Sequence, residues 1–146
     1  MSQTTVKILV DNTKGVLNAL SGRDLLPAAR NGGLVVQNSA RPAAPIDKGA
    51  LRASIHVEDD EVTTTAAWVN VGSELIYARI QEFGGVIEPK NKKMLSWLGK
   101  DGSRIFAKRV HIPAQPYLRP AMDNNHEQIK NAVGATIKMI IERVTA

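Results

Sequence analysis

Few residues in this chain could perform acid–base or metal chemistry, and their spacing fits no known arrangement. The three histidines, His56, His111 and His126, are scattered, and His126-Glu127 lacks the second histidine that a zinc-protease helix requires. The four adjacent carboxylates of Glu58–Glu61 could attract a hard cation such as calcium, but they lack calcium-loop spacing and a glycine for the sharp turn. We interpret them as a solvated acidic turn.

Other catalytic signatures are also missing from the sequence. The chain has no cysteine, which excludes disulfides, thiolate metal sites and cysteine nucleophiles. It has neither a glycine-rich phosphate loop nor a Gly-x-Ser-x-Gly elbow. Glu88-Pro89-Lys90 has the Glu-x-Lys spacing of one arm of metal-dependent nucleases, but Pro89 is unsuited to such a strand and no acidic partner precedes it. We therefore expect no enzyme activity, no metal and no cofactor.

Positive charge is concentrated in one segment. The stretch from Glu88 to Arg109 holds seven basic and two acidic residues, which accounts for the net charge of +5 of the whole chain. The basic residues are Lys90, Lys92, Lys93, Lys100, Arg104, Lys108 and Arg109. Such a patch favours an anionic partner, either phosphate or an acidic protein face, although lysines also keep ordinary hairpins soluble. We take these seven as candidate contact residues, with Trp97 available to stack on bases if the partner is DNA.

The same segment has the pattern of a hairpin. Its two arms carry the apolar residues Met94, Trp97 and Leu98, then Ile105, Ala107 and Val110. Between them lies Lys100-Asp101-Gly102, and Asp-Gly is a preferred pair in hairpin turns. The sequence therefore predicts that residues 88–111 form a basic hairpin inserted into the domain.

Length and hydropathy favour one compact domain over residues 1–146. No apolar run approaches the roughly 20 residues that cross a bilayer, so we expect no membrane contact. The first twelve residues lack the charged-then-apolar pattern of a signal peptide, which favours a cytoplasmic product.

Periodicity predicts the elements that surround these segments. In the first half we expect a strand at Thr5–Val10, a short helix from Asp11 or Asn12 to Leu20, and a helix capped by Asp24 that continues across Gly32-Gly33 to Ala40. Alternation then predicts a strand over residues 51–57, a turn at 58–61 and an antiparallel strand over 62–71. Trp68 falls on the opposite face of that last strand from Val69 and Val71, which indicates that both faces are covered.

A long helix is predicted from Pro120 to about Val144. Its apolar stripe comprises Ile129, Val133, Ile137, Ile140, Ile141 and Val144. We expect this stripe to pack against the sheet. The fold class is then α+β: a small antiparallel sheet packed by N-terminal helices and a long C-terminal helix, with a protruding basic hairpin.

Three further segments carry turn and cap residues at particular spacings. Residues 77–85 (YARIQEFGG) indicate a short helix with Tyr77, Ile80 and Phe83 on one apolar stripe, ended by a glycine pair. Residues 112–122 (IPAQPYLRPAM) indicate a stiff extended lead-in, after which Pro120 takes the first helical position. Residues 45–55 (PIDKGALRASI) pass through a turn at Asp47-Lys48-Gly49.

In their order along the chain (45–55, 77–85, 112–122), the three segments resemble those of the head–tail joining, or tail-completion, proteins of long-tailed double-stranded-DNA phages. The resemblance spans roughly Pro45 to Met122, with Lys48 where threonine is usual and Tyr117 where phenylalanine is common. The matching positions are Pro45, Gly49, Leu51, Ser54, Tyr77, Glu82, Phe83, Gly84, Pro116, Tyr117, Leu118 and Pro120. We expect them to be mainly structural, with Phe83 and Tyr117 in the core.

The resemblance implies a structural virion protein of the phage neck that joins the DNA-filled head to the tail. It implies a homo-oligomeric ring, other neck and tail proteins as partners, packaged DNA as a further contact, and a place in the virion after synthesis in the host cytoplasm. Two alternatives stay open: a tail terminator that caps the tail tube, and a small non-enzymatic DNA-binding protein.

Overall fold

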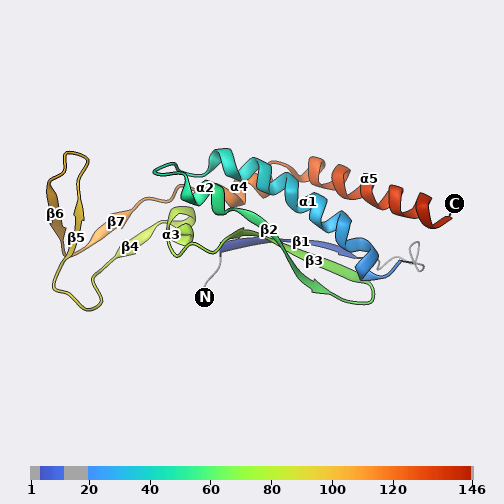
Figure 1. Ribbon diagram of the computed structural model, residues 1–146, viewed down its shortest axis with the longest axis horizontal. Coiled ribbons are helices and arrows are strands. Elements are labelled where there is room, and N and C mark those ends of the chain that lie inside the picture. The colour runs from blue at the N-terminus through green and yellow to red at the C-terminus, as the bar shows by residue number, and fades with distance from the viewer. Residues whose placement is uncertain (1–3, 12–19, 146) are drawn as a thin grey trace.

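A computed structural model describes residues 4–11 and 20–145, and the helix expected before Leu20 lies largely outside the described residues. The chain forms a single small α+β domain with an elongated body, from one end of which an arm projects (Figure 1). The predicted fold class is confirmed. No helix in the described part of the chain is long and apolar enough to cross a bilayer.

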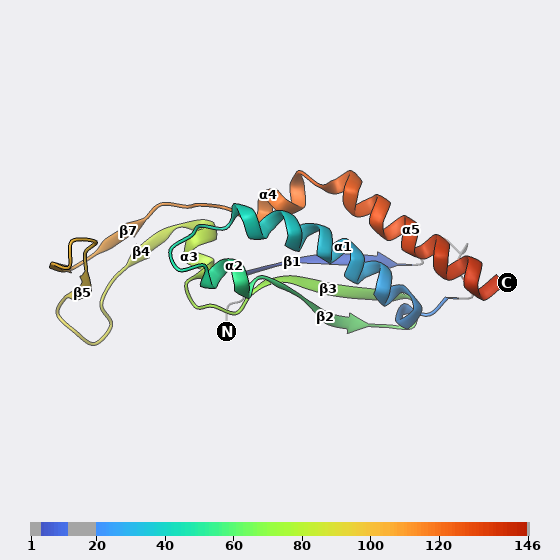
Figure 2. The same ribbon diagram turned by 45° about the horizontal axis from the view of Figure 1, so that its top comes forward.

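The body is built on a three-stranded antiparallel sheet. Its strands are β1 (Thr4–Asp11), β2 (His56–Val62) and β3 (Ala66–Ser73), in the order β1-β3-β2. Ile8 pairs with Val69 and Val57 with Val71. These apolar residues face the same side because side chains alternate along a strand. The helices lie on that side (Figure 2), and Trp68 is half-buried on the other.

Helix α1 (Gly22–Ala43) covers the apolar face of the sheet. It begins at Ser21 rather than Asp24, because Ser21 and Asp24 form a reciprocal capping box. The predicted continuity across the glycine pair is confirmed. A Cβ on Gly32 would lie 2.9 Å from Val133, and one on Gly33 would lie 2.9 Å from Val57. The two glycines therefore let the helix approach both a second helix and the sheet.

The predicted long C-terminal helix is present, but its start and its packing partner differ from the prediction. It is interrupted: α4 (Leu118–Asp123) and α5 (His126–Thr145) are separate helices. Asn125 makes the break, since its side-chain Nδ2 donates to the Ala121 carbonyl at the end of α4 (2.8 Å) while its own carbonyl accepts from Ile129 in α5 (2.9 Å).

The second difference concerns the partner of α5, which packs chiefly along α1, with Ile129 reaching the core shared with the sheet. A side-chain hydrogen bond of 2.8 Å joins Asn31 of α1 to Thr136 of α5. The physical reason is that α1 already occupies the apolar face of a sheet only three strands wide. The stripe on α5 is therefore completed by helix–helix contact.

The region after Gly49 also differs from the expected strand and turn. Residues 50–54 form the short helix α2 (Ala50–Ser54), because Leu51 and Ile55 are four apart and suit a helix face as well as an alternating strand. Strand β2 then runs through the acidic residues, where Asp59 pairs with Arg30 and Asp60 with Lys7. The turn follows at residues 63–65.

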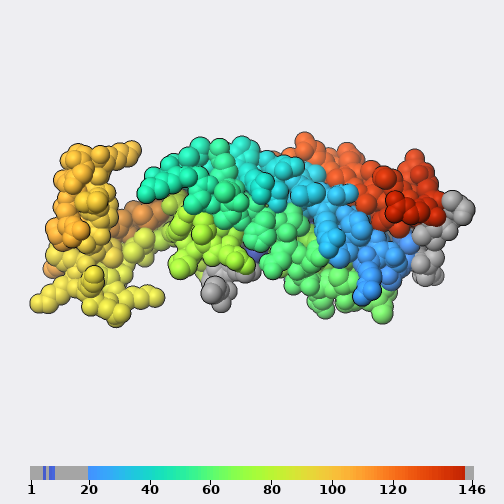
Figure 3. Space-filling view, viewed as in Figure 1, coloured from blue at the N-terminus to red at the C-terminus, as the bar shows by residue number. Residues whose placement is uncertain are grey.

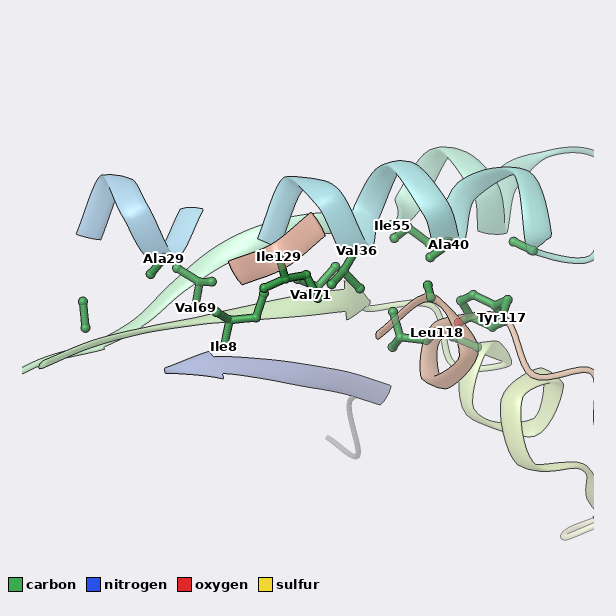
Figure 4. Close-up of a cluster of buried hydrophobic side chains, with 14 of the residues drawn as sticks. Ile8, Ala29, Val36, Ala40, Ile55, Val69, Val71, Tyr117, Leu118 and Ile129 are labelled. Atoms are coloured by element: carbon green, nitrogen blue, oxygen red, sulfur yellow. The ribbon is translucent and has the colours of Figure 1, made fainter. Parts of the chain in front are cut away.

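The core lies between the sheet and the helices. Figure 4 shows Val36 of α1 beside Val71 of β3, Val69 further along the same strand, and Ala40 of α1 above Tyr117 at one end of the same cluster. Each of these five residues is fully buried. The residues just before α4 therefore belong to the core of the body, and their burial anchors the base of the arm.

The arm consists of two short two-stranded ladders in series. The first pairs β4 (Gly85–Ile87) with β7 (Val110–Ile112), and the second pairs β5 (Leu95–Leu98) with β6 (Arg104–Ala107). The second ladder is the predicted hairpin, with Asp101-Gly102 in its turn. Figure 3 shows the outer part of the arm standing clear of the body.

Candidate assembly interface

The junction between body and arm is organised by one buried carboxylate. Glu82, on α3 (Ala78–Phe83), is 4% exposed. Its Oε2 accepts hydrogen bonds from the backbone N–H groups of Tyr117 (2.8 Å) and Leu118 (2.9 Å), and its Oε1 accepts from Arg119 (2.9 Å). The next residue, Pro120, has no N–H. Glu82 thus caps the whole N-terminus of α4 from 35 residues away, which explains how a charge is tolerated in the core.

Gly84 holds the other side of this junction. It ends α3 in the left-handed region, with φ of 68°, as the glycine pair predicted. A Cβ there would lie 2.7 Å from the backbone nitrogen of Ala114. Next to it, the N–H of Gln115 donates to the carbonyl of Gln81 (2.7 Å). Only glycine combines this φ with so close a crossing of two backbone segments.

Tyr117 and Phe83 were both expected in the core, and the structure separates them. Tyr117 is fully buried, as predicted, whereas Phe83 is 63% exposed and that prediction is wrong. Because Glu82 turns inward to reach α4, its neighbour Phe83 points outward; Tyr77 is also exposed. Burial, and then the nearby Glu82 charge, raise the pKa of the Tyr117 hydroxyl to about 12. That hydroxyl has no hydrogen-bond partner among the described residues.

The other motif positions gather around the same junction. Leu51 is buried, and the Ser54 hydroxyl lies 2.7 Å from the Ser73 hydroxyl, which ties α2 to β3. An open hollow of about 420 Å³ brings all three motif segments together. It is lined by Pro45, Ile46, Asp47, Lys48, Gly49, Ala50, Leu51, Tyr77, Gln81 and Gln115.

A second hollow, of about 520 Å³, has both Glu82 and Phe83 in its lining. Pro116 and Pro120 also line it. Pro120 is the third residue of α4 rather than the first. The motif residues therefore divide into a buried scaffold, which includes Glu82, Tyr117 and Leu118, and an exposed set that shapes two hollows.

The seven candidate basic residues are all exposed and all lie on the arm. Arg109 pairs with Glu88 (2.7 Å). The other six have no ion-pair partner in the described part of the chain. They lie in the loop after β4 (Lys90, Lys92 and Lys93), in the hairpin turn (Lys100), in β6 (Arg104) and in the link to β7 (Lys108). The structure places all seven on one projecting element.

The apolar surface of the arm was not anticipated. A groove of about 410 Å³ lies along it, with Trp97 in its lining, while Leu98 and Phe106 are 68% and 57% exposed on the outer ladder. Apolar residues at consecutive positions, Trp97-Leu98 and Ile105-Phe106, were the available signal, because neighbours in a strand point to opposite faces.

One group among the described residues has metal-ligand types in proximity. The ligand atoms of His56, Glu58 and Glu74 lie within 4.8 Å of one another, and His56 Nδ1 lies 2.8 Å from the Ser54 carbonyl. Both carboxylates are exposed. Exposed acidic groups commonly gather without an ion, so this cluster does not indicate a metal site. It does concentrate negative charge at this place on the surface.

Comparison with known proteins adds one match. Residues 16–84 match the HK97-gp10-like family, described as "Bacteriophage HK97-gp10, putative tail-component". The matched range contains the motif segment 45–55 and all but the last residue of the segment 77–85. It excludes the β5–β6 ladder of the arm and the motif segment 112–122. No curated protein and no solved structure matched the chain. This match covers 69 of the 146 residues, just under half of the chain, and it supports a relationship to phage head–tail and tail proteins.

Proposed function

We propose that this protein is a structural component of the phage neck that completes the tail by joining it to the DNA-filled head. The family supports a tail-related structural role. The observation that carries the finer proposal is the arm: an exposed, apolar and basic element anchored to a rigid body through Glu82 and Gly84. A joining protein needs such a firm base with surfaces directed at more than one partner.

The low intrinsic stability of the arm and its exposed apolar side chains support docking of the arm onto a partner. An isolated two-stranded ladder is marginally stable in water, and the arm consists of two of them with large apolar side chains exposed. Exposed apolar patches of this kind mark interaction sites. The exposed Phe83 and the two hollows beside α3 extend this surface to the base of the arm.

In the particle the protein would form a homo-oligomeric ring between head and tail, with other neck and tail proteins as partners. Its location would then be the virion. A tail terminator, which caps the tail tube, is the alternative role. The same surfaces would serve it, because a terminator would also bind as a ring to the end of the tube.

A stop codon early in this gene in its parent phage or prophage tests the proposal, with the induced lysate imaged by electron microscopy. Full heads beside finished, unattached tails are the expected result. Intact infectious particles would refute a neck role. Abnormally long or missing tails would assign the protein to tail termination instead.

The six cations of the arm that have no ion-pair partner among the described residues favour packaged DNA as a second contact. If they bind phosphate, the logarithm of the affinity for duplex DNA falls linearly with the logarithm of the salt concentration, with a slope near −0.9 for each phosphate neutralised. Lys100→Ala in the turn of the hairpin should lower the slope by about one unit, and Lys138→Ala on α5 should not change it. Absence of binding at low salt would exclude the DNA contact.

A further inference from the structure

The groove on the arm is built from the facing sides of both ladders. Ile87 and Val110 are register partners in the inner ladder, and Trp97 and Ile105 in the outer one. The groove, called the arm groove below, is lined by Ile87, Leu95, Ser96, Trp97, Val110 and Ile112. All six residues belong to the arm, so no body side chain fills it.

Basic residues lie next to the groove-lining strands in the sequence. Lys92 and Lys93 lie in the loop that leads into β5, and Lys108 lies between β6 and β7. All three are exposed and lack an ion-pair partner within the described residues. An occupant that matches this surface has an apolar centre and negatively charged flanks.

The body presents a surface of that chemistry. Ile76, in the loop between β3 and α3, is 97% exposed, and the adjacent Tyr77 is 43% exposed. Glu74 lies two residues before Ile76, and the carboxylate of Glu58 lies within 4.8 Å of that of Glu74. Neither glutamate has an ion-pair partner in the part of the chain that the structure describes. Glu58, Glu74, Ile76 and Tyr77 are called the acidic knob below.

We propose that the arm groove of one copy receives the acidic knob of the next copy. The inference rests on the proposed function, whose ring it specifies. Groove and knob are different surfaces of one chain, so the contact is heterologous, and repeated head-to-tail contacts of this kind close into a ring when the rotation permits. Ile76 enters the apolar groove beside Trp97, and Glu58 and Glu74 meet Lys92 and Lys93.

Cysteine cross-linking in assembled particles tests the contact, because the natural chain contains no cysteine. Ser96→Cys places a thiol in the arm groove and Ile76→Cys places one on the acidic knob. Particles of the parent phage that carry both substitutions, once oxidised, should give a ladder of multimers on non-reducing gels. Particles carrying either substitution alone should give none.

A charge exchange provides a second, independent measurement. Lys92→Glu/Lys93→Glu and Glu58→Lys/Glu74→Lys should each lower the yield of infectious particles at least about tenfold, because like charges would then face each other across the contact. The two pairs combined should restore most of the yield. Lys130→Glu/Lys138→Glu, a matched reversal on α5, should leave it unchanged.

The outcomes separate this inference from the proposed function. Particles that contain the protein but give no multimer ladder, or a combined variant as defective as its parents, would overturn the contact between groove and knob while leaving the neck role intact. Absence of the protein from purified particles would overturn the neck role, and the inference with it.

Discussion

Glu82 offers the sharpest test of how this fold is held together. Its carboxylate accepts hydrogen bonds from the backbone N–H groups of Tyr117, Leu118 and Arg119, and the N-cap residue Tyr117 makes no side-chain capping hydrogen bond. Substituting Glu82→Ala removes all three acceptors at once. The substitution also leaves a cavity where the α3 side chain reached the helix.

The size of the effect follows from the burial of the three donors. The bonds to Tyr117 and Leu118 are buried, and an unsatisfied buried donor costs about 1–3 kcal/mol. The bond to Arg119 is only partly buried, so water can replace much of it. We therefore expect Glu82→Ala to lower the free energy of unfolding by about 3–5 kcal/mol, a large part of the roughly 5–15 kcal/mol of a typical domain.

Glu82→Gln should cost less, about 1–3 kcal/mol, because one carbonyl oxygen remains while charge assistance and one acceptor are lost. Equilibrium urea unfolding measures both variants, and amide hydrogen exchange at residues 117–119 localises the effect. Glu127→Gln is the control, since Glu127 lies exposed on α5 beside Lys130. A loss below about 1 kcal/mol for Glu82→Ala, with those amides still protected, would refute the reasoning.

The remaining predictions address the junction and the arm. Gly84→Ala should destabilise by more than Gly49→Ala, because both have positive φ but only Gly84 would place a Cβ against backbone; urea unfolding of the pair decides. Tyr117→Phe should be neutral or stabilising at pH 7. Since the folded-state pKa of about 12 lies above the unfolded value of about 10, wild-type stability should fall between these pH values by more than that of Tyr117→Phe, as alkaline unfolding titrations would show. Phe83→Ser should change stability by less than about 0.5 kcal/mol yet lower particle yield, which plaque titres measure. Replacing residues 88–109 by Asn-Gly should keep body stability within about 1 kcal/mol, by thermal unfolding, and abolish head–tail joining in lysates.

Local patterns in the sequence were sufficient for several elements. The strand β1, the continuity of α1, the short helix ended by Gly84 and the hairpin with its Asp-Gly turn were all predicted and are present. Each depends on residues a few positions apart, where alternation, caps and turn residues act directly on the backbone.

Tertiary contacts decided the rest. Periodicity did not distinguish strand from helix at residues 51–55, because Leu51 and Ile55 suit both until Gly49 and the neighbouring β3 select the helix. Nor did it show that α5 would lie on α1, since an apolar stripe specifies burial but not its partner.

The functional junction shows the same division most clearly. The motif segments and the concentration of basic residues at 88–109 were visible in the sequence, and so was the expectation that Tyr117 would be buried. That Glu82 turns inward while Phe83 faces solvent was not visible, because the reason is a set of hydrogen bonds to a helix end 35 residues away. Phe83 is exposed because the neighbouring Glu82 must point inward to reach the start of α4. Only the folded chain brings Glu82 and that helix end together.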